Sequence, residues 1–209
     1  MIERYYQIGR INVKHNLLPH IIIGLALCLI APFLMGVNNL NQYQSAQVLE
    51  MYVSLLGIVF LVPIFYLDQD ANIREVVRAK YTPMIQHYLI RLFEAIILLV
   101  IFIMGFILFL HYGECDFPVG YFFMGTLAEA IFLGGLGVFI YGIVDNIVVG
   151  YMISMVYYMI NFGCKPQMIP HFYLFTMMRG SYENKIYLGV GGVVLLVLGL
   201  VLREVRFRK

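Results

Sequence analysis

Glu129 is the residue of this chain whose type and position point most directly to chemistry. It lies inside the apolar stretch 118–144, which is long enough to cross a lipid bilayer as a helix. An ionised carboxylate is costly in hydrocarbon, so an intramembrane acid usually marks a transport pathway or binds a buried partner. The sequence leaves both interpretations open. It also leaves open a proton-coupled carrier or a membrane-embedded enzyme that uses Glu129.

Familiar catalytic and metal-binding motifs are absent from the sequence. No serine lies in a G-x-S-x-G context, and neither an H-E-x-x-H motif nor a Walker A motif occurs. The five histidines are dispersed, whereas metal ligands converge, and the three cysteines lack metal-ligand spacing. We therefore predict no enzymatic activity, no metal and no cofactor in this chain. The net charge of +2 is too small to indicate a nucleic-acid partner.

A second group of informative residues occupies the loop 68–91. Asp70, Arg74 and Arg78 recur at four-residue spacing with the acid first, which favours a short amphipathic helix. Such a helix between two membrane spans is typical of an element that docks into a groove of a partner protein. The alternative is a solvated connector that follows the positive-inside rule, but that rule does not account for the interleaved acids. The residues expected to contribute to docking are Asp68, Asp70, Arg74, Glu75, Val76, Val77, Arg78 and Arg91.

The composition predicts the elements that position these residues. Of the 209 residues, 62% are hydrophobic and 12% are charged, against about 25% charged residues in an ordinary soluble domain. A helix needs about 20 residues to cross the hydrocarbon core of a bilayer, and six apolar blocks are close to that length. We predict a single all-α membrane domain, 1–209, with spans at about 21–37, 51–67, 92–110, 118–144, 147–162 and 186–202.

The placement of lysine and arginine predicts the orientation, because short cytoplasmic loops are enriched in both. With six spans and both termini in the cytoplasm, eleven of the fourteen basic residues fall on the cytoplasmic side. Only Lys165, Arg179 and Lys185 fall outside. An odd number of spans would separate the basic start of the chain from its basic end, so the distribution also favours an even number.

Two further segments are predicted to lie at the membrane surface. Residues 2–18 carry a stripe of polar residues at helical spacing, which predicts an interfacial amphipathic helix before the first span. The segment 164–180 is apolar, is too short to span twice, and contains Pro166 and Pro170. This pattern predicts a re-entrant or interfacial hairpin. The aromatic residues of this segment, taken singly, are equally typical of the belt at a membrane interface.

The chain resembles the type-2 ABC transporter permeases, the membrane subunits of many bacterial exporters. In that family the loop after the second span reads E-R-E-x-G-T-x-E, followed by an apolar pair, a proline and a lysine at the start of the third span. The matching positions here are the acidic Asp68, Asp70 and Glu75, the apolar Val76 and Val77, and the basic Arg91. The differing positions are Asn72 for the glycine, Ile73 for the threonine and Tyr81 for the proline.

The resemblance implies a permease in the bacterial cytoplasmic membrane that pairs with a second copy or a paralogue. It also implies that a separate ABC ATP-binding subunit, which carries ATP and Mg²⁺, docks on the 68–91 loop and powers export. An apolar, aromatic-rich chain suits a peptide-, antibiotic- or lipid-like cargo. In the family the segment before the last span closes the exit, which implies that Phe172, Tyr173 and Phe175 line an outer gate.

Overall fold

The computed structural model is a bundle of helices, and it describes residues 9–36, 39–70, 74 and 84–208. Apolar runs with few charges favour helices here because a helix satisfies all of its backbone hydrogen bonds internally. Within the described residues there is no strand. The elements in chain order are η1 (Val13–Leu17), α2 (Leu18–Met35), α3 (Gln42–Met51), η2 (Val53–Leu55), α4 (Leu56–Leu61), η3 (Val62–Asp68), α6 (Met84–Tyr112), α7 (Val119–Val144), α8 (Ile147–Gly163), η4 (Pro166–Met168), η5 (Met177–Arg179) and α9 (Glu183–Arg208).

Five helical stretches are long and apolar enough to cross a membrane: Gly9–Met35, Gln42–Asp68, Met84–Tyr112, Val119–Val144 and Glu183–Arg206. The chain therefore has the helices of a multi-pass membrane protein, as its composition predicts. The remaining apolar helix, α8, has 17 residues. At 1.5 Å per residue it extends about 26 Å, slightly less than a hydrocarbon core of about 30 Å.

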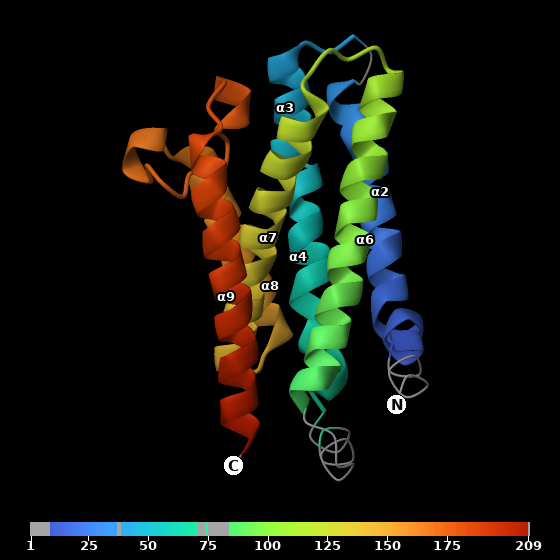
Figure 1. Ribbon diagram of the computed structural model, residues 1–209, viewed down its shortest axis with the longest axis vertical. Helices are drawn as coiled ribbons and strands as arrows, with labels where there is room; N and C mark the ends of the chain where they lie inside the picture. Colours follow the sequence, from blue (N-terminus) through green and yellow to red (C-terminus); the bar gives the residue numbers. More distant parts are fainter. Residues whose placement is uncertain (1–8, 37–38, 71–73, 75–83, 209) are drawn as a thin grey trace.

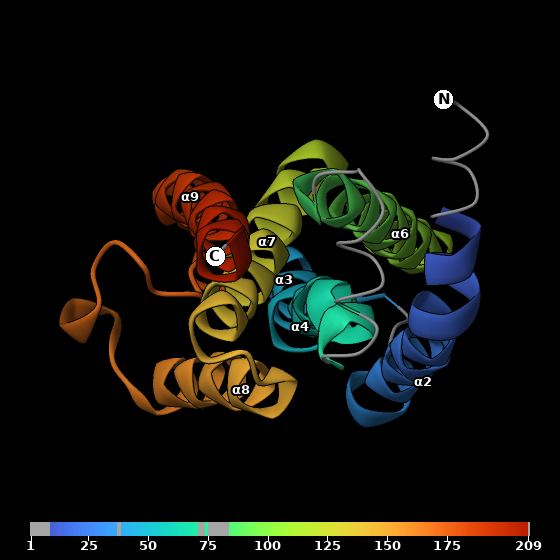
Figure 2. The same ribbon diagram turned by 90° about the horizontal axis from the view of Figure 1, so that it is seen from below.

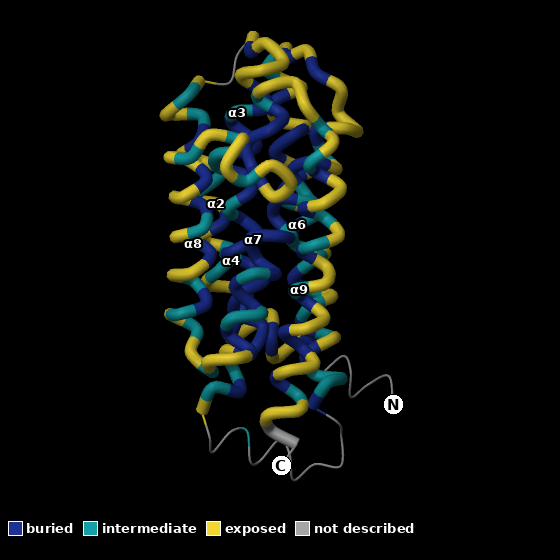
Figure 3. The backbone as a smooth tube through the Cα atoms, turned by 90° about the vertical axis from the view of Figure 1, so that its left-hand side faces the viewer, coloured by how far each residue is buried: buried dark blue, intermediate teal, exposed yellow. Residues whose placement is uncertain are grey.

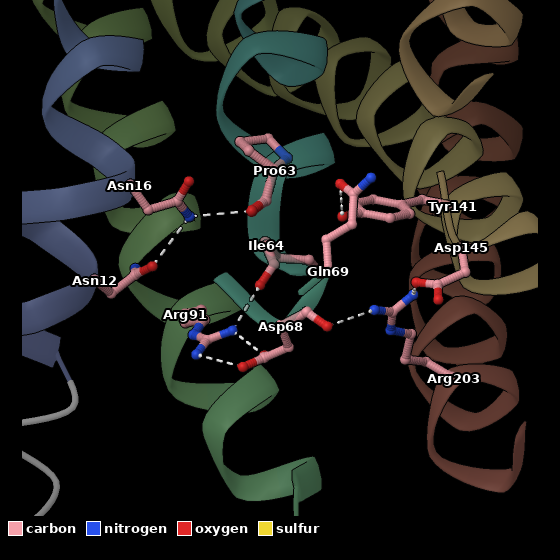
Figure 4. Close-up of polar contacts among 10 residues, drawn as sticks. All are labelled: Asn12, Asn16, Pro63, Ile64, Asp68, Gln69, Arg91, Tyr141, Asp145 and Arg203. Atoms are coloured by element: carbon pink, nitrogen blue, oxygen red, sulfur yellow. Dashed lines mark hydrogen bonds and ion pairs between the residues drawn. The ribbon is translucent and has the colours of Figure 1, made fainter. Parts of the chain in front are cut away.

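The start of the chain differs from the prediction of a separate interfacial helix over 2–18. Residues 1–8 lie outside the described part, and from Gly9 onward the helix continues without a break into the first candidate span. The amides of Asn12 and Asn16 explain the continuity, because both are buried against the bundle. Asn12 donates to Glu94 of α6 at 2.8 Å. Asn16 donates to the carbonyl of Pro63 at 3.0 Å (Figure 4).

The helices run side by side, and both termini lie at one end of the bundle, here called the terminal end (Figure 1). The start of α6 also lies at the terminal end, whereas the start of α3 lies at the opposite end, here called the far end. In the end-on view, α7 lies between α9, α8 and α4, and α2 lies at the edge beside α6 (Figure 2). Buried residues follow the axis of the bundle, while exposed residues cover its outer faces (Figure 3).

Glycines bring α7 and α9 into close contact. A Cβ atom on Gly135 would lie 2.6 Å from the carbonyl oxygen of Gly192, and a Cβ atom on Gly142 would lie 2.6 Å from that of Gly199. Both pairs are seven residues apart on their helices, which is two helical turns. The two helices are parallel, so the pairs form one seam of small residues that allows the backbones to approach closely.

Candidate functional site

A buried cluster of three ionisable residues joins three helices towards the far end. Glu50 belongs to α3, Glu129 to α7, and Lys185 is the third residue of α9. The ammonium nitrogen of Lys185 lies 2.7 Å from Oε1 of Glu50 and 2.7 Å from Oε2 of Glu129. All three side chains are buried. The intramembrane carboxylate singled out by the sequence therefore has a lysine partner and a second carboxylate beside it.

The two carboxyl groups of this cluster have unequal partners. Glu50 accepts the backbone N–H of Met177 at 2.7 Å and that of Met178 at 2.9 Å, in addition to its ion pair. Glu129 accepts only from Lys185, and its Oε1 is buried without a hydrogen-bond partner among the described residues. One ammonium and two backbone N–H groups thus stabilise a negative charge on Glu50, whereas only the ammonium stabilises a negative charge on Glu129.

The same cluster holds the segment 164–182, here called the cap segment, against the helices. Lys185 donates to the carbonyl of Leu174 at 2.6 Å, and Leu174 N–H donates to Asn161 of α8 at 3.1 Å. Tyr157 of α8 donates to the carbonyl of Phe172 at 2.8 Å. The two ends of the cap segment differ, since η4 lies away from the bundle whereas η5 packs on α3 (Figure 1).

The three aromatic residues expected at an outer gate belong to this cap segment. Phe172 is 40% exposed and its ring stacks on Phe132 of α7 with 5.6 Å between centroids. Tyr173 and Phe175 are buried, and Phe175 meets the ring of Tyr158 edge-on at 5.5 Å. The structure therefore gathers the predicted pathway residues in one region, since Leu174 lies among these aromatic residues and binds the lysine that pairs with Glu129.

A groove on the outer surface reaches the cluster. It lies between α7 and α9, has a volume of about 440 Å³, and includes Lys185 in its lining. Tyr121 and Tyr182 also line the groove, and their rings are 5.8 Å apart. Small residues form part of the wall, namely Gly125, Ala128 and Gly189. The groove therefore borders the buried cluster through Lys185, and neither glutamate of the cluster lines it.

A second ionic arrangement lies at the terminal end, at the base of the 68–84 connection. Asp68 at the end of η3 forms a buried ion pair with Arg91 of α6 (Figure 4). Arg91 also donates to the carbonyl of Ile64 at 3.3 Å. This pair fastens the helix that enters the connection to the helix that leaves it.

Asp145 links the connection to α7 and α9. It follows the last residue of α7, and it accepts from Arg74 at 3.0 Å and from the fully buried Arg203 of α9. The guanidinium of Arg203 also lies over the ring of Phe65 at 4.9 Å and that of Tyr141 at 5.2 Å. One carboxylate thereby receives two cations from different parts of the chain (Figure 4 shows the contact with Arg203).

The residues predicted to dock a partner divide into three groups. Asp68 and Arg91 are buried in their ion pair and act between helices. Arg74 is mostly buried against Asp145, and Asp70 is exposed. The remaining docking residues lie outside the described part of the chain: Glu75, Val76, Val77 and Arg78.

Four charged residues of these two sites were not singled out by sequence reasoning: Glu50, Asp145, Lys185 and Arg203. A signal for two of them exists, because Lys185 precedes Gly192 by seven residues and Arg203 follows Gly199 by four. Both cations therefore lie on the glycine face of α9 and must point towards α7. For Glu50 and Asp145 the sequence holds no comparable signal.

Within the described residues, no three His, Cys, Asp or Glu side chains gather in a way that could hold a metal ion. The ionisable residues instead form ion pairs at the two ends of the bundle. This arrangement suits coupling between helices or the binding of a small charged species. Comparison of the chain with protein-family models, with curated proteins and with solved structures gives no match.

Proposed function

We propose that this chain is the membrane-spanning permease subunit of an ATP-driven ABC exporter, located in a bacterial cytoplasmic membrane. It pairs with a second copy or a paralogue, and a separate ATP-binding subunit docks on the 68–91 loop and supplies the energy. The cargo is a peptide-, antibiotic- or lipid-like compound. This proposal extends the resemblance of the loop sequence to the type-2 permeases.

The observation that best supports the proposal is the ion pairing of Asp145 with both Arg74 and Arg203. A permease must convert a push on a cytoplasmic loop into movement of its membrane helices. Arg74 lies in the loop, Arg203 lies in α9, and Asp145 ends α7, so a displacement of the loop acts directly on two helices. The Asp68–Arg91 pair adds α6 to the same connection.

The proposed topology has six spans, with α8 as the fifth and with both termini in the cytoplasm. The arrangement of the termini at one end of the bundle supports an even number of crossings (Figure 1). The cap segment then lies on the outer side, where it forms the re-entrant closure expected for this class. In this orientation the first candidate span, Gly9–Met35, begins on the cytoplasmic side.

The proposal is tested by purifying the full chain together with the ATPase encoded next to it in the genome. We expect a stable complex, and we expect the paired charge reversal Glu75→Lys and Arg78→Glu to abolish it. Lys165→Glu is the matched control, because Lys165 is exposed and belongs to the cap segment rather than to the loop. Failure of the unmodified chain to bind the ATPase would refute the proposal, as would binding that is unaffected by reversal of the loop charges.

A further inference from the structure

We propose that Glu129 is a proton-binding site: it holds one proton, and the cluster of Glu50, Glu129 and Lys185 is electrically neutral. This inference goes beyond the permease proposal and does not depend on it. It rests on the charges, the burial and the hydrogen-bond partners of the cluster.

The charge count gives the first argument. Two ionised carboxylates and one ammonium would leave a net charge of −1 in a site where Glu50 and Glu129 are fully buried. An uncompensated buried charge is costly, and a buried group neutralises by taking up a proton instead. No other cation is paired with the cluster among the described residues. One bound proton removes the excess charge.

The partners of the two carboxyl groups indicate which one carries the proton. Glu50 accepts two backbone N–H groups and the ammonium of Lys185, all of which favour its ionised form. Glu129 has only the ammonium, and its Oε1 is buried without a donor. A protonated Oε1 would instead act as a donor, so the proton belongs on Glu129.

Ser54 provides an acceptor for that proton. Its hydroxyl lies beside the Glu129 carboxyl, and its own hydrogen is donated to the carbonyl of Glu50 at 2.6 Å. A hydroxyl whose own hydrogen is already donated can accept a hydrogen bond from a neighbouring carboxylic acid through its lone pairs.

The other groups around Glu129 do not change the net charge of the cluster. Tyr158 of α8 lies near the carboxyl and donates its hydroxyl hydrogen to the carbonyl of Met51 at 2.8 Å. Tyr52 lies near Tyr158. Thr126, one turn before Glu129, and Thr176 of the cap segment have buried hydroxyls without partners among the described residues. These neutral hydroxyls can pass a proton along but cannot balance a charge.

The site borders a groove and anchors the cap segment. Lys185 lines the groove between α7 and α9 and binds both carboxyl groups of the cluster. Glu50 and Lys185 also bind the backbone of Met177, Met178 and Leu174. The proton therefore resides where the cap segment is anchored.

Infrared spectroscopy of the purified full chain in lipid nanodiscs tests the inference, because a protonated carboxylic acid absorbs separately from carboxylates. At neutral pH we expect one protonated carboxyl per chain from the cluster, and we expect its band to disappear at alkaline pH. Glu129→Gln removes the band, and Glu129→Asp shifts it. Glu50→Asp leaves it in place. Glu183→Gln, which changes an exposed acid two residues before Lys185 on α9, is the matched control and leaves it unchanged.

Two results would overturn the inference. One is the absence of a protonated carboxyl in the unmodified chain at neutral pH, a result that needs no variant to fold. The other is a band that persists in Glu129→Gln or that shifts with Glu50→Asp rather than with Glu129→Asp. If Glu129→Gln does not fold, the two aspartate variants still decide the assignment. None of these measurements involves an ATPase, so they remain valid whatever becomes of the permease proposal.

Discussion

The ammonium nitrogen of Lys185 lies 2.7 Å from Oε2 of Glu129, and the two residues belong to neighbouring parallel helices, α9 and α7. Below them along the same two helices lie the glycine contacts and then the Arg203–Asp145 ion pair. The interface of α7 and α9 is thus a seam of small residues with an ion pair near each end. Small residues set the separation of the two helices, and the ion pairs set their register.

Replacing Lys185 is expected to destabilise the far end of the bundle. Lys185→Met leaves two buried carboxyl groups without their cation and removes the bond to Leu174, at a cost of about 3–5 kcal/mol in the free energy of unfolding. Thermal unfolding in detergent measures the change. Lys165→Met, in the exposed part of the cap segment, is the control and should leave the midpoint nearly unchanged. Equal unfolding midpoints for the two variants would show that Lys185 has no structural role.

The glycine seam predicts a second pair of contrasting variants. A Cβ atom on Gly192 would lie 2.7 Å from the backbone nitrogen of Phe132, so Gly192→Ala should cost about 1–3 kcal/mol through overpacking. At Gly105 of α6 a Cβ atom meets nothing within 4 Å. Gly105→Ala should therefore stabilise the helix by up to about 1 kcal/mol. Unfolding midpoints that move in the same direction for both variants would contradict the close contact of α7 and α9.

The Asp68–Arg91 pair is expected to show strong coupling in a double-mutant cycle. Arg91→Met strands a buried carboxylate, and Asp68→Asn strands a buried guanidinium, so each single variant should lose about 3–5 kcal/mol of stability. The double variant should lose clearly less than the sum, because neither charge remains unpaired. Additive losses, measured as free energies of unfolding in detergent and denaturant, would mean that the two side chains do not interact.

The two cations on Asp145 should differ in their effect on stability. Arg203 is fully buried and also lies over two aromatic rings, so Arg203→Met should cost about 3–5 kcal/mol. The pair of Arg74 with Asp145 retains 15% and 19% side-chain exposure, so Arg74→Ala should cost about 1 kcal/mol or less. Thermal unfolding separates the two cases. A larger loss for Arg74→Ala would reverse the roles assigned to the two cations.

The sequence predicted the helical class and the approximate position of each apolar helix, because long uncharged runs determine both. It placed Lys185 in an outer loop, since the apolar block begins at Ile186, whereas α9 begins at Glu183 and includes the lysine. Whether a charge at the edge of an apolar block points to solvent or into the bundle depends on the helix register, which a charge count does not reveal.

The partners of Glu129 were beyond sequence reasoning for a different reason. Lys185 is 56 positions away along the chain, and Glu50 is in an earlier span. To predict that these residues meet, one must know which helices are neighbours. The same applies to Asp68 and Arg91: their types and positions fit a docking loop, yet the packing of η3 on α6 turns them towards each other. A one-dimensional pattern identifies charged residues but not their pairing.

The ATP hydrolysis rate of the assembled complex in lipid vesicles tests the permease proposal most directly. The full chain and the ATPase encoded beside it should form a complex, and its ATP hydrolysis rate should differ from that of the ATPase alone. Asp145→Asn, which weakens the link to Arg74 and Arg203, should reduce that difference at least severalfold while the complex still assembles. Lys165→Ala should leave the difference intact. An ATPase whose rate is the same with and without this chain would contradict the account.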